Sequence, residues 1–384
     1  MHFGLIQLLI VARFLTDGLL KFDLFGQPVT LYFAALLAIY GLLGIFLNFA
    51  KWIPLLLLLI YLLSSALFGF ADWGVSGIQE SVRTLAILGI YIISVDKFNR
   101  LGIFRILSTF TYLMTVNSLF AIVQFFLGAG FTVDGVRRFS GFLAHPNSAA
   151  LLAASALIFL QLFHKDLEMR GILFCRLLLF CGLILSLSFM GILTFVFMSA
   201  VVVVFQSGRI SRILRFLTLA SISTFLLFIF NSGFHTRVLQ FTTSNSYQVG
   251  AETNSFQWRL EKWKILLEFW KFKPLLGQGY GTSTSGLMLD GAVPHNEYIR
   301  ILIELGMFGS LLLLLIYGFV FRFFFLDYKL TKSREAIFVC ALMLGGGLNA
   351  IAENTFQYTL WGIFLMLAMA VRTHAPHGQI GRNS

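Results

Sequence analysis

Long apolar runs recur along this chain of 384 residues, and they constrain its fold more than any other feature. Runs of about 18 residues or more are long enough to cross a bilayer. The composition agrees, because 58% of the residues are hydrophobic and only 12% are charged. Inside a bilayer every backbone polar group needs an internal partner, so these runs must be helices, and their continuous apolar character excludes a membrane barrel. We therefore predict an all-α fold, a polytopic transmembrane helical bundle.

The runs define about twelve candidate spans of this bundle. The first carries Arg13 and Asp17, and no small-residue cleavage site follows it, so we expect it to remain in the protein as a membrane helix. The spans are expected at residues 3–20, 31–49, 53–71, 82–95, 102–128, 148–163, 171–186, 190–206, 216–231, 297–321, 337–352 and 357–371.

The distribution of basic residues predicts the orientation of the spans. The chain has 28 Lys and Arg against 17 Asp and Glu. In a soluble protein this excess would suggest nucleic acid, but in a membrane protein it reflects cytoplasmic loops rich in Lys and Arg. The basic stretches 207–215 and 322–334 share one side if the N-terminus is cytoplasmic. We therefore predict a cytoplasmic N-terminus, contact with membrane lipids and no nucleic-acid partner.

We expect one membrane domain, residues 1–384, with a large external loop at 232–296. Within this loop, residues 256–271 have the pattern of an amphipathic helix. Tryptophans on its apolar stripe favour the headgroup layer, so we expect this helix on the membrane surface. The polar tail 372–384 is expected to be disordered and cytoplasmic. The stripe consists of Phe256, Leu260, Trp263, Leu267 and Trp270.

Two polar signatures, residues 137–147 and 294–298, each precede a long apolar run at the external face. A helix N-terminus offers free N–H donors and a partial positive charge, which together favour an anion. Asn147 and Asn296 are plausible N-caps of these helices. Arg137 and Arg138 lie just before the first helix, and external arginines run against the usual bias of membrane loops. They either bind a phosphate or diphosphate with their planar forks, or extend to lipid headgroups.

His295 is the candidate general base, because an imidazole titrates near neutrality and this one opens a helix on the external face. The alternative is a histidine that only caps the helix or lies at the interface. Three carboxylates in or beside spans are either proton relays or simply paired, as Asp17 is expected to be with Arg13. The other two are Glu304 and Glu353.

No cofactor is predicted from the remaining motifs. No cluster of His, Cys and carboxylates has the spacing of metal ligands, so we predict no metal site. The glycine pattern at 277–281 follows no strand and lies on the side without ATP, so it gives little support for a nucleotide site. We expect this stretch to form a flexible turn.

In three places the sequence resembles the O-antigen ligase and polymerase superfamily of bacterial membrane glycosyltransferases. The first is Arg-Phe-Ser-Gly-Phe at 138–142, followed by His-Pro-Asn at 145–147. The second is Arg259 with Trp263, followed by the Pro-Leu-Leu-Gly stretch at 274–281. The third is His-Asn-Glu-Tyr at 295–298, followed by Glu-Leu-Gly at 304–306. The order and spacing match over roughly residues 100–325.

This resemblance implies a glycosyltransferase in the bacterial inner membrane, acting at the periplasmic face. The donor would be an oligosaccharide linked to undecaprenyl diphosphate, and the acceptor another glycan or the lipid A core. By the same resemblance, Arg138 and Arg259 would bind the diphosphate. His295 would take the proton from the acceptor hydroxyl, with inversion at the anomeric carbon and without a metal.

Two points stay open from the sequence. Many relatives carry a basic residue in the external turn at 186–191, but here that turn reads Ser-Leu-Ser-Phe-Met-Gly. The sequence also leaves undecided whether the enzyme is a polymerase or a ligase. The alternative of another class is a transporter or flippase for an anionic lipid-linked substrate. Such a protein should show inverted repeats and helices broken at mid-membrane, and the sequence suggests neither.

Overall fold

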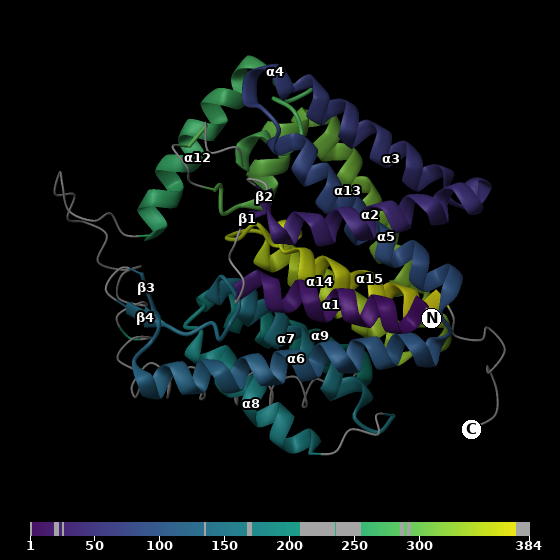
Figure 1. Cartoon of the computed structure of the whole chain (residues 1–384), viewed down its shortest axis with the longest axis vertical. Coiled ribbons are helices and arrows are strands. Elements are labelled where there is room, and N and C mark those ends of the chain that lie inside the picture. Colours follow the sequence, from purple (N-terminus) through teal and green to yellow (C-terminus); the bar gives the residue numbers. More distant parts are fainter. Residues whose placement is uncertain are drawn as a thin grey trace.

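A computed structural model of the chain confirms the all-α polytopic bundle (Figure 1). It describes residues 2–18, 23–24, 27–133, 136–166, 171–207, 235, 255–284, 288–289 and 293–373. The helices are α1 (His2–Gly18), α2 (Val29–Leu47), α3 (Phe49–Phe68), α4 (Phe70–Trp73), α5 (Ser76–Lys97), α6 (Arg100–Leu127), α7 (Pro146–Phe163), α8 (Ile172–Leu185), α9 (Phe189–Ser207), α12 (Ser255–Phe272), α13 (Glu297–Thr331), α14 (Arg334–Asn349) and α15 (Thr359–Thr373). Two short 3-10 helices are η1 (Thr282–Thr284) and η2 (Thr355–Gln357).

The predicted spans coincide with these helices, except for 216–231, which lies outside the described residues. Within the described part of the chain, 7 helices are long and apolar enough to cross a membrane: α2, α3, α5, α6, α7, α9 and α13. Two antiparallel hairpins complete the fold. They pair β1 (Asp23–Leu24) with β2 (Gln27–Pro28), and β3 (Phe131–Val133) with β4 (Val136–Arg138).

Helix α7 is the centre of the bundle, and 89% of its apolar window is buried. It contacts α6, α8, α9, α14 and α15. The neighbouring helices can approach closely because α7 is rich in small buried residues, such as Ala150, Ala153 and Ala154. Small side chains let helix backbones come close enough for van der Waals packing. A second close pair is α2 and α5, where Gly41 faces Gly89 and a Cβ on either would meet the other's backbone.

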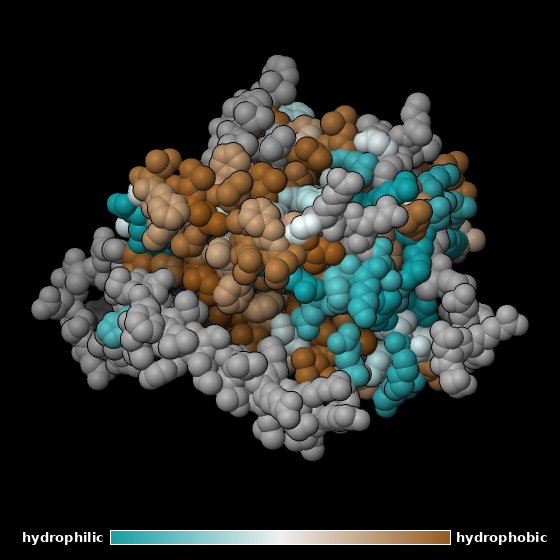
Figure 2. All heavy atoms as spheres, turned by 90° about the horizontal axis from the view of Figure 1, so that it is seen from below, coloured by the Kyte–Doolittle hydropathy of each residue, from teal (hydrophilic) through white to brown (hydrophobic). Residues whose placement is uncertain are grey.

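The outer surface is apolar, as expected for lipid contact. Large side chains such as Leu314, Leu315 and Phe319 on α13 are exposed. Figure 2 shows a broad apolar band beside a region of hydrophilic side chains at one end of the molecule.

The two ends of the bundle differ in chemistry. The end where α1 begins and α15 ends carries a series of ion pairs: Arg100 with Glu335, Arg334 with Asp166, and Arg372 with Asp327 (Figure 1). The other end carries the hairpins and α12. If the N-terminus is cytoplasmic, as predicted, the first end would be cytoplasmic and the second external. Arg372 corrects the predicted tail, because it is still part of α15; residues 374–384 lie outside the described residues.

Helix α13 is broken at Gly306, which corrects the expectation that no helix is broken. Gly306 has φ +64° and separates residues 297–305 from 307–331. The loop after α12 enters this break. The amides of Gln278 and Gly279 donate to the carbonyls of residues 303 and 304, at 2.8 and 2.9 Å. In return, the amides of Met307 and Phe308 donate to those of residues 274 and 275, at 2.9 and 3.2 Å.

The stretch 277–281 is therefore not the flexible turn expected from its glycines. Gly277 has φ +75°, and a Cβ there would collide with the backbone of residues 304 and 306. At Gly306 a Cβ would collide in turn with the backbone of residue 275. Both glycines are required because two backbones approach each other directly and both turn through the left-handed region.

Helix α12 confirms the predicted helix at 256–271, and the placement of its stripe on the membrane surface stays a prediction. Leu266 is fully buried against residues 288, 289 and 303, whereas Leu260 is 38% exposed. The Trp263 indole donates to the carbonyl of Pro294 at 2.8 Å. One face of α12 thus packs on the start of α13. Of the large external loop, residues 232–234 and 236–254 lie outside the described residues.

Candidate active site

The loop after β4 is held in place by two amide side chains of α6. Gln124 donates to the carbonyl of Gly141 at 2.6 Å and accepts from its amide at 3.0 Å. Asn117 does the same for the neighbouring residues, donating to Ser140 O and accepting from the Phe142 amide, both at 3.0 Å. Gly141 has φ +67°, and a Cβ there would meet Asn117. The Ser-Gly-Phe stretch therefore fixes the position of β4 against α6.

Arg137 and Arg138 point to opposite faces of β4, as neighbours on a strand must. Arg138 is 6% exposed; its Nε donates to the carbonyl of Ser186 at 2.8 Å, and its terminal nitrogen donates to Asn147. Arg137 is exposed and lies beside Gly128 and Gly130. The structure thus separates the two arginines. The turn at 186–191 supplies a carbonyl acceptor for Arg138, that of Ser186.

Asn147 has a different role from the predicted one. Helix α7 begins at Pro146, its N-cap position is His145, and Asn147 lies inside the first turn. The predicted cap at Asn147 is therefore wrong. Its amide instead bridges two charged groups, because the oxygen accepts from Arg138 while the nitrogen donates to Glu353 Oε1 at 2.6 Å.

The predicted cap at Asn296 is confirmed, and this separates its role from that of His295. The Asn296 side chain accepts from the amide of Ile299 at 3.0 Å. His295 has φ +48° and a side chain that is 28% exposed, with Nδ1 3.4 Å from Glu353 Oε2. Its ring lies 5.9 Å from that of Trp258, edge to face. The cap is thus Asn296, and the imidazole is directed at a carboxylate.

Glu353 joins these groups into one site. It lies between α14 and η2 and is 2% exposed. Besides Asn147 and His295, its carboxylate accepts from Arg259 at 3.2 Å and from the Tyr358 hydroxyl at 3.0 Å. Burial alone would raise the pKa of Glu353. The hydrogen bond from His295, the charges of Arg259 and His295 and the bond from Tyr358 outweigh burial and lower this pKa to about 2.

Both terminal nitrogens of the Arg259 guanidinium, on α12, donate hydrogen bonds. Besides Glu353, it donates to the carbonyl of Ala352 at 3.0 Å, and its side chain is 19% exposed. Its Nε is buried and, among the described residues, has no hydrogen-bond partner. The guanidinium therefore keeps donor capacity for a further acceptor.

The charges around Glu353 sum to a net positive site. Arg138 and Arg259 contribute two positive charges against the one carboxylate, and the N-termini of α7 and α13 open beside them. Because Nδ1 of His295 faces the carboxylate, Nε2 is the ring nitrogen left to accept a proton. Such a site suits an anion held next to a hydroxyl that is to be deprotonated. In the described part of the chain, no group of three His, Cys, Asp or Glu could hold a metal ion.

A sequence model of the O-antigen ligase family matches residues 174–314. These residues are similar to an O-antigen ligase domain. The match confirms the resemblance to the O-antigen ligase and polymerase superfamily, and with it a multi-pass membrane enzyme that acts on glycans. Among curated proteins, none matches the chain.

The matched range contains Arg259, Asn296 and His295, whereas Arg138, Asn147 and Glu353 lie outside it. The fold brings both sets together at the end of the bundle that carries the hairpins. Glu353 and Tyr358 are the members that the sequence did not assign to the site. The available signal was a lone acidic residue at the external end of a span, because a carboxylate there needs a partner.

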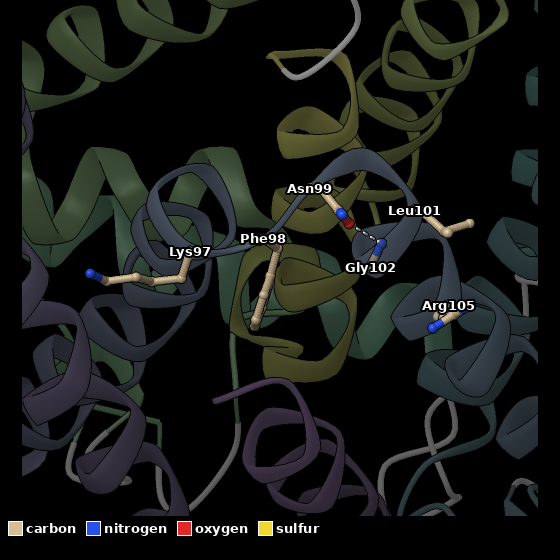
Figure 3. A pocket seen from close by; sticks show the side chains of 6 residues that line it. All are labelled: Lys97, Phe98, Asn99, Leu101, Gly102 and Arg105. Carbon is tan, nitrogen blue, oxygen red and sulfur yellow. Dashed lines mark hydrogen bonds between the residues drawn. The ribbon is translucent and has the colours of Figure 1, made fainter. Parts of the chain in front are cut away.

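A separate pocket lies at the opposite end, between α5 and α6 (Figure 3). It is lined by Lys97, Phe98, Asn99, Leu101, Gly102 and Arg105. Asn99 caps α6 by accepting from the Gly102 amide at 2.8 Å. The pocket lies at the end of the bundle opposite to the hairpins, so it is separate from the site around Glu353. The predicted pair of Arg13 with Asp17 is not resolved, since the side chain of Asp17 is outside the described residues.

Proposed function

We propose that this protein is an inverting, metal-independent glycosyltransferase of the bacterial inner membrane. It moves a glycan from undecaprenyl diphosphate to an acceptor hydroxyl at the periplasmic face. The observation that carries this proposal is the carboxylate of Glu353, which ties the candidate base His295 and the two candidate diphosphate ligands into one site.

The donor is held by its diphosphate. Arg138 is linked to Glu353 through Asn147, Arg259 bonds Glu353 directly, and the N-termini of α7 and α13 add oriented amides. When the bond between the sugar and the diphosphate breaks, negative charge develops on the leaving oxygen. Preorganised cations and amides stabilise this charge more than they stabilise the bound donor, which lowers the barrier.

The acceptor is activated by His295. Its Nε2 takes the proton from the acceptor hydroxyl as the hydroxyl oxygen forms its bond to the anomeric carbon. Attack opposite to the diphosphate inverts that carbon. The imidazolium that forms is stabilised by Glu353 on the Nδ1 side, as a carboxylate does in other base-assisted sites. The proton then leaves with the diphosphate or to water.

The class of acceptor decides whether the protein is a polymerase or a ligase. A second lipid-linked glycan makes the protein a polymerase, and the lipid A core makes it a ligase. The test is to incubate the purified protein with a lipid-linked repeat unit and no nucleotide. Chain growth with this donor alone identifies a polymerase, and transfer only after addition of lipid A core identifies a ligase.

The broken helix α13 favours a transporter or flippase. However, its break is filled by the loop at 274–279 through backbone hydrogen bonds, and the charged site lies at helix ends. The same purified protein distinguishes the two classes. If it forms no glycosidic bond with any acceptor but moves the lipid-linked donor across reconstituted vesicles, the glycosyltransferase proposal is wrong.

A further inference from the structure

A second buried cluster of charges lies around the first two turns of α13, outside the proposed active site. Its centre is Arg300, whose Nε donates to Glu297 at 2.8 Å and whose NH1 donates to Glu304 at 3.0 Å. The same NH1 lies 3.8 Å from Glu80 of α5. Arg83, 34% exposed in its side chain, donates to Glu80 at 3.2 Å. We call these five residues the Arg300 cluster.

Acidic groups outnumber basic ones in the Arg300 cluster. Glu80, Glu297 and Glu304 face two arginines, of which only Arg300 is fully buried. Within the described residues, the other polar neighbours are uncharged: Ser283 of η1 donates to Glu304 at 2.6 Å, and the Tyr280 hydroxyl bonds Thr84 at 2.7 Å. With all three carboxyls ionised, the cluster would keep one uncompensated negative charge away from water. An unpaired buried charge is costly, and a carboxyl in this position takes up a proton instead.

The oxygens show where the proton belongs. Glu304 has a partner on each carboxyl oxygen, Ser283 on one and Arg300 on the other. Glu297 is fully buried, and only its Oε1 is bonded, to Arg300. Its Oε2 has no hydrogen-bond partner within the described part of the chain. A bare carboxylate oxygen is the least favourable of these environments for negative charge.

We propose that the Arg300 cluster is a proton-binding site, and that Glu297 holds the proton as a neutral carboxylic acid. One bound proton balances the cluster, with two carboxylates against two arginines. The neutral cluster then joins α5, η1 and the first half of α13 without a net buried charge.

This proton site bears on the active site through the backbone. Glu297 follows His295 and Asn296 directly, and its amide donates to the carbonyl of Ala350 at 2.9 Å. Ala350 opens the turn that carries Glu353. Glu297 thus acts as a positioning residue, because it holds the segments of His295 and Glu353 at a fixed separation. If it ionises, the Arg300 cluster gains a buried net negative charge next to the segment that carries His295, and we expect the position of the base to change.

Infrared spectroscopy of the purified protein tests the site without any assumption about the reaction. At neutral pH the parent should show the carbonyl stretch of a buried carboxylic acid. Glu297→Gln should lose that band, while Glu268→Gln, at an exposed residue of α12, should keep it. Absence of the band in the parent refutes the proposal without need of any variant. Persistence of the full band in folded Glu297→Gln also refutes it, because the proton would then belong to another group.

The activity test rests on the proposed transferase function. At neutral pH Glu297→Gln should transfer within about threefold of the parent, since glutamine has the shape and charge of the neutral acid. As pH rises, the parent should lose activity when Glu297 gives up its proton, and the variant should retain it to higher pH. Equal alkaline limbs for the two proteins would remove Glu297 as a positioning residue. If neither protein transfers glycan, the proposed transferase function is wrong. The infrared measurement still decides whether Glu297 holds a proton.

Discussion

Two buried carboxyl groups near the start of α13, Glu353 and Glu297, have opposite surroundings. Glu353 is approached by Arg259, His295, Asn147 and Tyr358, so donors and cations outnumber it. Glu297 shares one buried arginine with Glu304, so carboxyls outnumber cations there. Burial alone therefore does not decide whether a carboxyl group is ionised. The local balance of charges and donors makes one an ionised anchor and the other a proton carrier.

The two surroundings also differ in access. His295 and Arg259 beside Glu353 are 28% and 19% exposed, so a substrate can reach them. Arg300 and its partners Glu297 and Glu304 are closed to solvent. A charged substrate therefore meets the Glu353 site, and the Arg300 cluster can act only through the position of α13.

The largest expected effect comes from removing the base. His295→Ala should lower the turnover number by about 10²–10⁴, because proton transfer by a positioned base contributes that much. The measurement is the rate with lipid-linked donor, beside the affinity for that donor, which should persist because the arginines remain.

His295→Asn is the matched control, because asparagine can cap a helix but cannot act as this base. The structure assigns the cap to Asn296, so the asparagine variant should be as inactive as the alanine variant. Near-normal turnover of His295→Asn would remove His295 from the chemistry. The site would then consist of arginines and helix ends alone.

The next effect concerns the stability that the ionised Glu353 supplies. Its pKa falls from an ordinary 4.5 to about 2, which corresponds to about 3 kcal/mol of stability at neutral pH. This contribution is fully present above pH 4.5 and is lost as pH falls towards 2. The Glu353→Gln variant should therefore have a lower free energy of unfolding than the parent when both are unfolded in detergent at neutral pH. The difference should shrink through this acid window, and a constant difference would contradict the assigned ionisation.

Much of this fold could be predicted from the sequence, because apolar length alone decides whether a segment can cross a bilayer. The break in α13 could not. Gly306 needs a partner loop about thirty residues earlier in the chain, and only the folded backbone shows that residues 274–279 fill the gap. The glycines at 277–281 predict a flexible turn when they are considered alone. Their role is to let this loop contact the break in α13, and the sequence does not show that contact.

The site was predictable in part. Arg138, Arg259 and His295 stand in motifs, and the structure brings them together. Glu353 stands in no motif, and three of its four partners, Asn147, Arg259 and His295, are far from it in the sequence. Asn147 was assigned to a cap because a polar residue before an apolar run favours that role. Its position one residue inside α7 frees the amide to bridge two charges.

A smaller effect is expected from changes that keep charge but lose shape. Arg138→Lys and Arg259→Lys should each reduce activity about 10- to 100-fold, because a lysine cannot bond its protein partners and a diphosphate at once. The check is transfer rate and donor affinity for each variant. Lys271→Ala is the control, since Lys271 is an exposed residue of the same helix as Arg259. Full activity of both lysine variants would show that general electrostatics suffices and that the planar fork has no role.

The smallest effect is expected at Arg137, and it tests which face of β4 belongs to the site. Arg137 and Arg138 are neighbours with the same side chain, but only Arg138 reaches Ser186 and Asn147. Arg137 is exposed on the opposite face, where a surface charge contributes about 0.5 kcal/mol or less. Arg137→Ala should therefore leave transfer within about twofold of the parent, whereas Arg138→Ala should weaken donor binding about 100-fold. Both variants can be measured in the same donor-binding assay. Equal losses in the two would mean that the alternation along β4 does not select one arginine, and that the diphosphate lies across both faces of the hairpin.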